Sequence, residues 1–324
     1  MTKYSVLVPF VTRRPEQILP YAALVALSRA HALWQGQSTL IEPHQGFTYA
    51  AGAGFRSPVG FGVTLMPLRH PYEAALQARS VAMTTGHPVV AGFGPGPAIF
   101  QENMLGRPYP SQLTAVREYV TVVRGLLGGG AIDFRGEYFG YRGILPPAVA
   151  PKVEIGLGVL RRGMARLAGE VADVAVTWLT PAAWLADTIM PALREGAKAA
   201  GRDMPRVAAM VPVALRRPDR TPAEQALASN AMHLQAPHYI DMLRKAGVGV
   251  TGKNTAADAA ALVEGGAFVS GDVEQVLTGL KEFEQAGADE IILNLTGVYN
   301  LQGPDETTNE LKSLLGALTG QKLR

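Results

Sequence analysis

Short apolar runs that end in glycine, proline or a polar residue alternate with helical patterns along the whole chain. Most of these runs are apolar nearly throughout, which is typical of parallel strands that are covered on both faces. We predict eight strands: Val6–Phe10, Ser38–Ile41, Val59–Leu65, Val89–Phe93, Val153–Leu157, Val174–Trp178, Val207–Val213 and Glu290–Leu295. Eight strands that alternate with helices favour an α/β fold, the (β/α)8 or TIM barrel. The competing doubly wound sheet needs a topological switch point, which nothing in the sequence marks.

The segments between the strands carry the helical period. From Thr114 to Leu127, apolar residues recur every three or four positions, which predicts an amphipathic helix. Asp272 followed three residues later by Gln275 predicts a capping box at the start of another helix.

The 324 residues are enough for two average domains or for one large barrel. We find no internal repeat, low-complexity tract or linker, and therefore expect a single domain over residues 1–324. Three connections exceed ordinary loop length: Gln45–Pro58, Gly94–Pro151 and Arg216–Ala288. The first is glycine-rich and a poor helix, whereas the other two are insertions after predicted strands 4 and 7. Long insertions in a barrel usually enclose the substrate.

Composition excludes several classes of protein. The chain has no cysteine, which excludes disulfides, thiolate nucleophiles and cysteine-ligated metals. Histidines and carboxylates show no metal-ligand spacing, so we expect no metal. The 30 basic residues are scattered and almost balanced by 27 acidic ones, so no nucleic-acid partner is expected. Without a long apolar run or a signal peptide, the sequence predicts a cytoplasmic protein and no membrane span.

Catalytic residues of a barrel lie at the C-terminal ends of the strands and in the loops that follow. Glu42 and His44 are the one acid–base pair among the predicted strand ends. A histidine there can donate or accept a proton, and a neighbouring carboxylate can hold its tautomer. The alternatives are a histidine with a structural hydrogen bond and a glutamate in an ordinary salt bridge. The remaining ends hold glycines, small residues and aromatics, which suit a large flat cofactor better than a hydrolytic triad.

Two glycine-rich strand ends are candidate binding segments. Gly94-Pro95-Gly96 would let a ligand approach the backbone closely, although a tight barrel turn explains it equally well. Gly158-Val159-Leu160-Arg161-Arg162 joins a strand to the start of a helix. Free N–H groups and guanidinium groups together form an anion site, typically for phosphate. The alternative for the two arginines is a solvated loop.

Several segments together follow the pattern of a known protein family. The most specific part is the helix that includes Ala115–Leu127, followed by the Phe-x-Gly-x-x-Phe spacing within Asp133–Phe139. Leu68–Pro71, Gly94–Gly96 and Leu167–Asp173 extend the pattern over most of the chain. With these segments the chain resembles the bacterial-luciferase-like family of flavin and deazaflavin oxidoreductases.

This resemblance implies a barrel that binds coenzyme F420 or FMN at the C-terminal ends of its strands. The cofactor ring would lie over a bulge after strand 3, often with a non-proline cis peptide, here at Val63-Thr64. The turn Gly158–Arg162 would hold the phosphate. An acid and a histidine flank the ring in deazaflavin-dependent members, a role for Glu42 and His44 that favours coenzyme F420. The expected cofactor contacts are Val63, Thr64, Gly94, Pro95, Gly96, Gly158, Val159, Leu160, Arg161, Arg162 and Thr177.

The first functional hypothesis is therefore an F420-dependent oxidoreductase that passes a hydride to a C=C or C=N bond, with His44 as proton donor or ring orienter. Phe10, Phe47 and Trp178 are expected to line an apolar substrate pocket, with room for a small molecule, a polyketide or a peptide. The alternatives are a two-component FMN-dependent monooxygenase and a barrel that binds flavin without turnover. The family also implies a homodimer.

Overall fold

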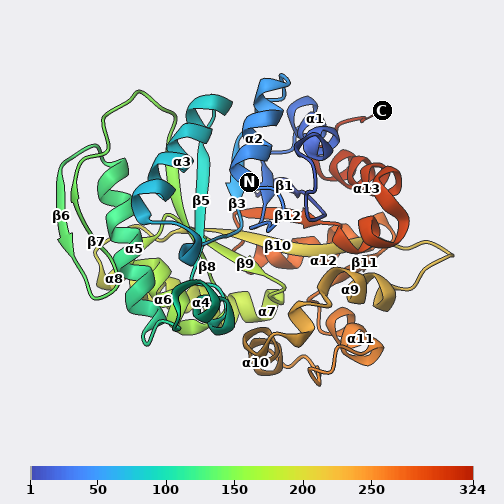
Figure 1. Cartoon of the computed structure of the whole chain (residues 1–324). Helices are drawn as coiled ribbons and strands as arrows, with labels where there is room; N and C mark the ends of the chain where they lie inside the picture. Colours follow the sequence, from blue (N-terminus) through green and yellow to red (C-terminus); the bar gives the residue numbers. More distant parts are fainter. Residues whose placement is uncertain (1, 324) are drawn as a thin grey trace.

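The computed structural model describes residues 2–323, in which eight parallel strands close into a barrel (Figure 1). In chain order the strands are β1 (Lys3–Leu7), β2 (Leu33–Gln35), β3 (Val59–Phe61), β5 (Val89–Gly94), β8 (Val153–Gly158), β9 (Val174–Trp178), β10 (Arg206–Leu215) and β12 (Glu290–Asn294). Each strand pairs in parallel with the next, and β12 pairs with β1 to close the ring. The predicted (β/α)8 barrel is confirmed.

Seven of the predicted strands overlap barrel strands, but the second one is wrong. Ser38–Ile41 is a turn, in which the Ser38 hydroxyl accepts hydrogen bonds from the N–H groups of Leu40 and Ile41 at 3.2 and 3.4 Å. A serine that bonds the backbone in this way competes with strand pairing. The strand at this place in the barrel is β2, which ends at Gln35.

The connection Gln45–Pro58, expected to be a poor helix, is also different from the prediction. Helix α2 spans Pro43–Gly52 and begins with a proline, whose fixed φ and missing N–H suit a first helical position. Phe47, Ala50 and Ala51 are buried on one face of α2. Packing of that face outweighs the low helix propensity of the glycines.

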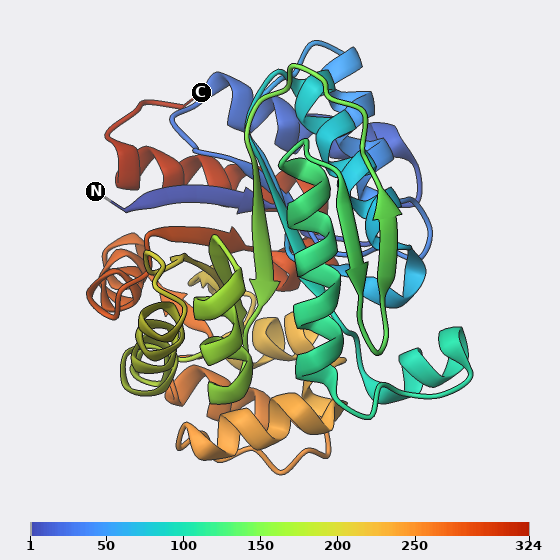
Figure 2. The ribbon, with the colours of Figure 1, turned by 90° about the vertical axis from the view of Figure 1, so that its left-hand side faces the viewer.

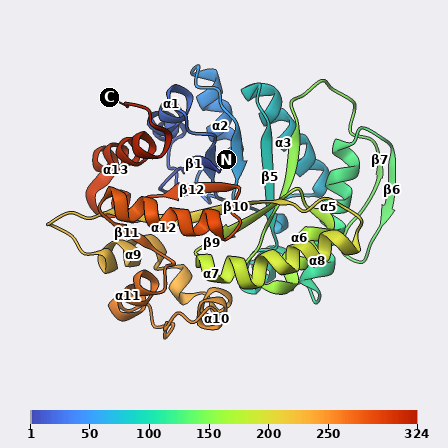
Figure 3. The same cartoon turned by 180° about the vertical axis from the view of Figure 1, so that it is seen from behind.

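Helices cover the outside of the barrel, and Figure 3 shows α6, α8 and α12 on the reverse side. Besides α2, they are α1 (Leu19–Leu27), α3 (Pro71–Thr85), α5 (Gln112–Leu127), α6 (Arg162–Val171), α8 (Met190–Ala199), α12 (Val273–Gln285) and α13 (Thr296–Thr319). The predicted amphipathic helix is α5. The capping box of α12 is confirmed, because Asp272 and Gln275 exchange hydrogen bonds with each other's backbone N–H groups at 2.9 and 3.0 Å. No helix within residues 2–323 is both long and apolar enough to cross a membrane.

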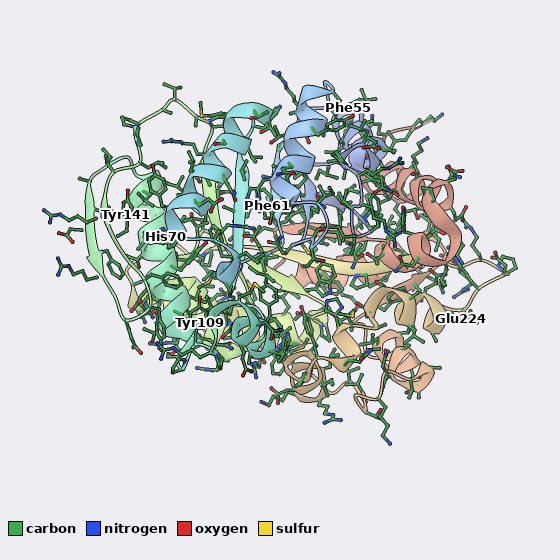
Figure 4. The ribbon with its side chains drawn as sticks, viewed as in Figure 1. Phe55, Phe61, His70, Tyr109, Tyr141 and Glu224 are labelled. Atoms are coloured by element: carbon green, nitrogen blue, oxygen red, sulfur yellow. The ribbon has the colours of Figure 1, made fainter. Side chains whose placement is uncertain are left out.

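The two predicted insertions follow β5 and β10. After β5 come α4 (Ala98–Leu105), α5 and a hairpin of β6 (Ile132–Arg135) and β7 (Gly140–Gly143). After β10 come α9 (Pro222–Asn230), α10 (Pro237–Lys245), α11 (Ala256–Glu264) and β11 (Val269–Gly271), which pairs with β10. Figure 2 shows the hairpin beside α5. Its Tyr141 also reaches His70 at the start of α3, with ring centroids 6.1 Å apart (Figure 4).

The Phe-x-Gly-x-x-Phe segment owes its spacing to a buried carboxylate on α5. Glu118 accepts the backbone N–H groups of Glu137, Tyr138 and Phe139 at 2.7, 2.7 and 3.0 Å. A side chain at Gly136 would overlap the Glu118 carboxylate. The motif therefore fixes the hairpin to α5, and its role is structural.

The barrel interior is filled by large apolar side chains around a central tryptophan, which is fully buried. This inner cluster consists of Leu7, Ala32, Trp34, Val90, Val174, Val176, Ala208, Met210 and Ile292. Gly60 of β3 faces the indole, and a side chain there would overlap the Trp34 ring. The glycine in this strand is therefore required by packing.

A buried carboxylate closes the N-terminal end of the barrel. Glu290, the first residue of β12, accepts hydrogen bonds from Ser5 Oγ at 2.6 Å and Trp34 Nε1 at 2.7 Å. Arg206 of β10 binds Glu290 at 2.6 Å and Glu154 of β8 at 2.8 Å. Ion pairs of Arg206 with Glu154 and Glu290 thus join the strands β8, β10 and β12.

We expect Glu290→Ala to lower the free energy of unfolding by about 3–5 kcal/mol, because it leaves buried donors without their acceptor. The measurement is urea denaturation followed by circular dichroism. Glu16→Gln is the matched control, since its ion pair with Arg14 is largely exposed and should contribute less than about 1 kcal/mol. Equal losses in the two variants would contradict this view of the barrel end.

Candidate active site

A cavity of about 1380 Å³ opens at the C-terminal ends of the barrel strands. Its floor comes from residues at the ends of six strands: Val8, Gln35, Val63, Gly94, Gly158 and Trp178. The two insertions supply a further part of the wall, including Ile99 of α4 and His233 between α9 and α10. Ligand pockets commonly measure about 300–1,000 Å³, so this cavity has room for a cofactor and a second molecule.

A bulge after β3 places Val63 at the floor of the cavity. The peptide bond Gly62–Val63 is cis, one bond before Val63–Thr64, where the family resemblance led us to expect a non-proline cis peptide, and β4 (Thr64–Leu65) follows. A side chain at Gly94 would come within 2.9 Å of a Val63 methyl group, so the bulge needs a glycine there. Thr64 is buried and donates its hydroxyl to the Gly92 carbonyl at 2.9 Å, away from the cavity lining.

The connection from β8 to α6 forms one side of the cavity. Gly158, Val159, Leu160 and Arg161 line it, and so do Gly163 and Met164 in the first turn of α6. No side chain caps the start of α6, which leaves its first N–H groups available to an anion. Arg162 is directed elsewhere and binds Glu195 at 2.6 Å.

Glu42 and His44 lie together at the start of α2, where Glu42 is the residue before the first turn. The Glu42 carboxylate binds His44 Nδ1 at 3.1 Å, Arg69 at 2.6 Å and Gln37 Nε2 at 2.8 Å. The His44 ring stacks on Phe61 of β3 with centroids 4.3 Å apart; Phe61 is labelled in Figure 4. The acid and the histidine are therefore paired, although they lie at the start of a helix and not at the end of a strand as predicted.

The environment sets the charge of each member of this pair. Burial lowers the pKa of His44 and the Arg69 charge acts in the same direction, while the Glu42 carboxylate opposes them. Burial alone would raise the pKa of Glu42, but hydrogen bonds from His44 and Gln37 and the Arg69 charge outweigh it, so this pKa is lowered. At neutral pH the pair is a carboxylate beside a neutral imidazole.

The structure brings most of the predicted site residues to the cavity. Those that line it are Phe10, Val63, Gly94, Pro95, Gly96, Gly158, Val159, Leu160, Arg161 and Trp178. Glu42 and His44 lie behind Gln37, which does line the cavity. Thr177 is buried within β9. Phe47, expected on the substrate pocket, packs instead in the core against Phe61 with centroids 5.2 Å apart, because it lies on the inner face of α2.

Sequence reasoning missed an aromatic wall that the insertion after β10 builds. The His233 ring stacks on Trp178 with centroids 5.2 Å apart, and Tyr239 meets His233 edge-on at 4.7 Å. Burial lowers the pKa of His233 to about 4, and His238 acts in the same direction. The indication in the sequence was the pair of histidines, His233 and His238, inside a long insertion. Their spacing does not suit two ligands of one metal ion, so the pair pointed to no particular function. Within residues 2–323, no group of three or more histidines and carboxylates could hold a metal ion.

Comparison with curated proteins finds relatives whose matched stretches cover about half of this chain or less. The chain is 27% identical over 178 residues to a 5,10-methylenetetrahydromethanopterin reductase from Methanopyrus kandleri, which is 49% of this chain and 50% of that one. It is 34% identical over 119 residues to an F420-dependent glucose-6-phosphate dehydrogenase from Nakamurella multipartita, which is 35% of each chain. The matched stretches thus span half or less of these curated relatives.

The fold has a wider match among solved structures. The coenzyme F420-dependent tetrahydromethanopterin reductase from Methanopyrus kandleri aligns with a TM-score of 0.74 at 21% identity, over 99% of this chain and 98% of that one. A profile of the family described as luciferase-like monooxygenase matches residues 21–290. Since that match covers most of the chain, this protein belongs to the luciferase-like monooxygenase family.

Proposed function

We propose that this protein is a coenzyme F420-dependent oxidoreductase that reduces a C=C or C=N bond of an organic substrate. The observation that carries the proposal is the Glu42–His44 pair near a cavity that glycines line at several strand ends. The family resemblance implies that such a pair flanks the ring in deazaflavin-dependent members. Natural products and peptides are the substrate classes that we consider first, because the cavity exceeds what a cofactor alone would fill.

The residues present fit a cofactor that has a flat ring and a phosphate. Val63 and the glycines around it offer a backbone surface for the ring. The uncapped start of α6 offers N–H groups for the phosphate. A side chain added at Gly163 would meet only Leu113, at 3.6 Å, so the space before the helix start is open to a ligand.

Two of the relatives described above support the choice of coenzyme F420 over FMN. The Nakamurella multipartita relative is named for its dependence on coenzyme F420, and so is the solved Methanopyrus kandleri reductase with the same fold. The first is a dehydrogenase and the second a reductase, so they leave the direction of hydride transfer open. The C=C or C=N acceptor is therefore our own proposal.

The protein's own residues bind and orient the reactants. When bound, reduced coenzyme F420 supplies a hydride, two electrons with one proton, to one atom of the double bond, while a second proton adds to the other atom. The backbone of Gly158–Arg161 and the start of α6 would hold the phosphate of the cofactor. Val63 would contact its ring, and α4 with the segment between α9 and α10 would limit access of water.

The geometry favours His44 as a positioning residue over a proton donor. Its Nδ1 faces the Glu42 carboxylate and therefore carries the ring proton of the neutral imidazole. The lowered pKa leaves little imidazolium at neutral pH. Glu42 in turn accepts a hydrogen bond from the side-chain amide nitrogen of Gln37. The amide oxygen of Gln37 accepts a hydrogen bond from Arg69 at 3.2 Å. His44 and Arg69 thus hold the amide that reaches the cavity.

Coenzyme F420 is expected to bind at least about tenfold more tightly than FMN, as measured by isothermal titration calorimetry and thermal shift. The reason is the acid–histidine pair, which the resemblance associates with the deazaflavin ring. Tighter binding of FMN would contradict the proposal and favour the two-component monooxygenase. In that case oxygen consumption with reduced FMN is the assay to run.

A carboxylate at the start of α6 should weaken cofactor binding without harming the fold. We expect Gly163→Asp to lower the affinity for coenzyme F420 by about tenfold or more, because it repels the phosphate. An acidic residue in a first helical turn stabilises the helix, so the melting temperature should not fall. Gly163→Asn has nearly the same shape without the charge and should keep most of the affinity. Equal effects of the two substitutions would place the phosphate elsewhere.

The pKa of His44 separates the two roles that we considered for it. Nitrogen-15 NMR of the histidine rings, assigned with His44→Asn, should show a pKa below the ordinary value of 6.5 and a proton on Nδ1 of the neutral ring. Glu42→Gln should lower this pKa further, because the carboxylate stabilises the imidazolium. A pKa above the ordinary value, or a neutral ring protonated at Nε2, would favour the proton donor.

A further inference from the structure

The cavity has almost no permanent charge. Among the described residues that line it, Arg161 is the single arginine, lysine, aspartate or glutamate. Its guanidinium lies 3.4 Å from the Asp241 carboxylate, and its backbone precedes the first turn of α6. The one cation is therefore already paired and stands beside the proposed phosphate site. A second charged ligand would find no counterion among the described lining residues.

The histidines on the wall do not supply that counterion. His233 and His238 both line the cavity, and burial lowers the pKa of each, that of His233 to about 4. Both rings are therefore neutral near pH 7. The charged cluster of Glu42 and Arg69 lies behind Gln37, which presents an uncharged amide to the cavity. The wall offers dipoles and aromatic surface in place of charge.

Aromatic rings form part of the cavity wall. Trp178 and His233 are stacked with 27° between their planes, and Tyr239 closes the group edge-on. Phe10, after β1, lines the same cavity and stacks on Tyr299 at 4.5 Å. Such rings bury large apolar areas of a ligand at a low cost in conformational entropy.

Large apolar side chains also surround the mouth of the cavity. Val11 after β1, Ile99 on α4, Leu113 on α5 and Met232 after α9 all line it and are 58, 64, 43 and 81% exposed. A single exposed apolar residue is ordinary, but here four from separate elements border one opening. A bound molecule that reaches the mouth would remove their apolar surface from water.

We propose that the second substrate of this site, given the function proposed above, is an uncharged and mainly apolar molecule that lies against Trp178, His233 and the apolar mouth. Phosphorylated substrates are excluded. A phosphate dianion on this wall would lose its hydration without gaining an ion pair. The glucose 6-phosphate in the name of the Nakamurella multipartita relative therefore lies outside the substrate class of this chain.

The test compares two probes that differ in a phosphate. The full chain is titrated with 2-naphthol and with 2-naphthyl phosphate near neutral pH, and binding is followed by quenching of tryptophan fluorescence. Inorganic phosphate is present in both titrations to occupy the start of α6. We expect 2-naphthol to bind about tenfold or more tightly than 2-naphthyl phosphate. Equal affinities, or tighter binding of the phosphate, would overturn the proposal.

A substitution at the mouth should reverse this preference. Met232→Lys places a cation at the opening and should raise the affinity for 2-naphthyl phosphate by about fivefold, while lowering that for 2-naphthol. Leu27→Lys is the matched control, because Leu27 on α1 is 74% exposed and does not line the cavity. If the two lysine variants behave alike, the mouth is not part of the binding site and the proposal fails.

These titrations need no coenzyme, so their outcome is separate from that of the cofactor experiments. If the protein prefers 2-naphthol but does not bind coenzyme F420, the proposed function is contradicted, while the preference of the pocket for uncharged, apolar molecules is supported. A chain that binds coenzyme F420 and prefers 2-naphthyl phosphate would support the proposed function and overturn the substrate class.

Discussion

The hydrogen bond from the Trp34 indole to the Glu290 carboxylate is the interaction on which the rest of the structure depends. Eight strands can close into a barrel only if side chains fill the interior, and Trp34 fills its centre where Gly60 leaves room. Its N–H would be costly to bury alone, so the N-terminal end carries a carboxylate, which Arg206 balances. With that end closed by paired charges, the opposite end can remain open as the cavity.

The parts of the fold that could be predicted are those whose sequence pattern has a single physical explanation. Apolar runs such as Val89–Gly94 need cover on both faces, and this one is a strand that is buried throughout. By contrast, β2 has three residues and is too short to show a pattern, although its Trp34 occupies the centre of the barrel. Helix α2 could not be predicted from its glycine content, because it is burial of Phe47 against Phe61 that stabilises it.

The same distinction holds for the candidate site. Glycines at strand ends reflect a local requirement, since Gly94 must leave room for Val63, and sequence alone pointed to them. The pairing of Glu42 with His44 followed from their spacing, but their distance from the cavity depends on where α2 begins. His233 reaches Trp178 through the path of a long insertion. No local pattern encodes such a path, because it results from the packing of α9 and α10.

The charged cluster of Glu42 and Arg69 is separated from the cavity by the uncharged side chain of Gln37, and this arrangement reconciles two opposing needs. Orientation of a polar group at the cavity requires strong hydrogen bonds, which charged partners provide. An apolar ligand, however, binds poorly beside an exposed charge, because the charge would lose its hydration without gaining a partner. Glu42 and Arg69 neutralise each other beside the neutral His44 ring, and they act on the cavity through the Gln37 amide. The wall thereby gains a fixed dipole without a net charge, so geometry can be controlled while the pocket stays suited to uncharged molecules.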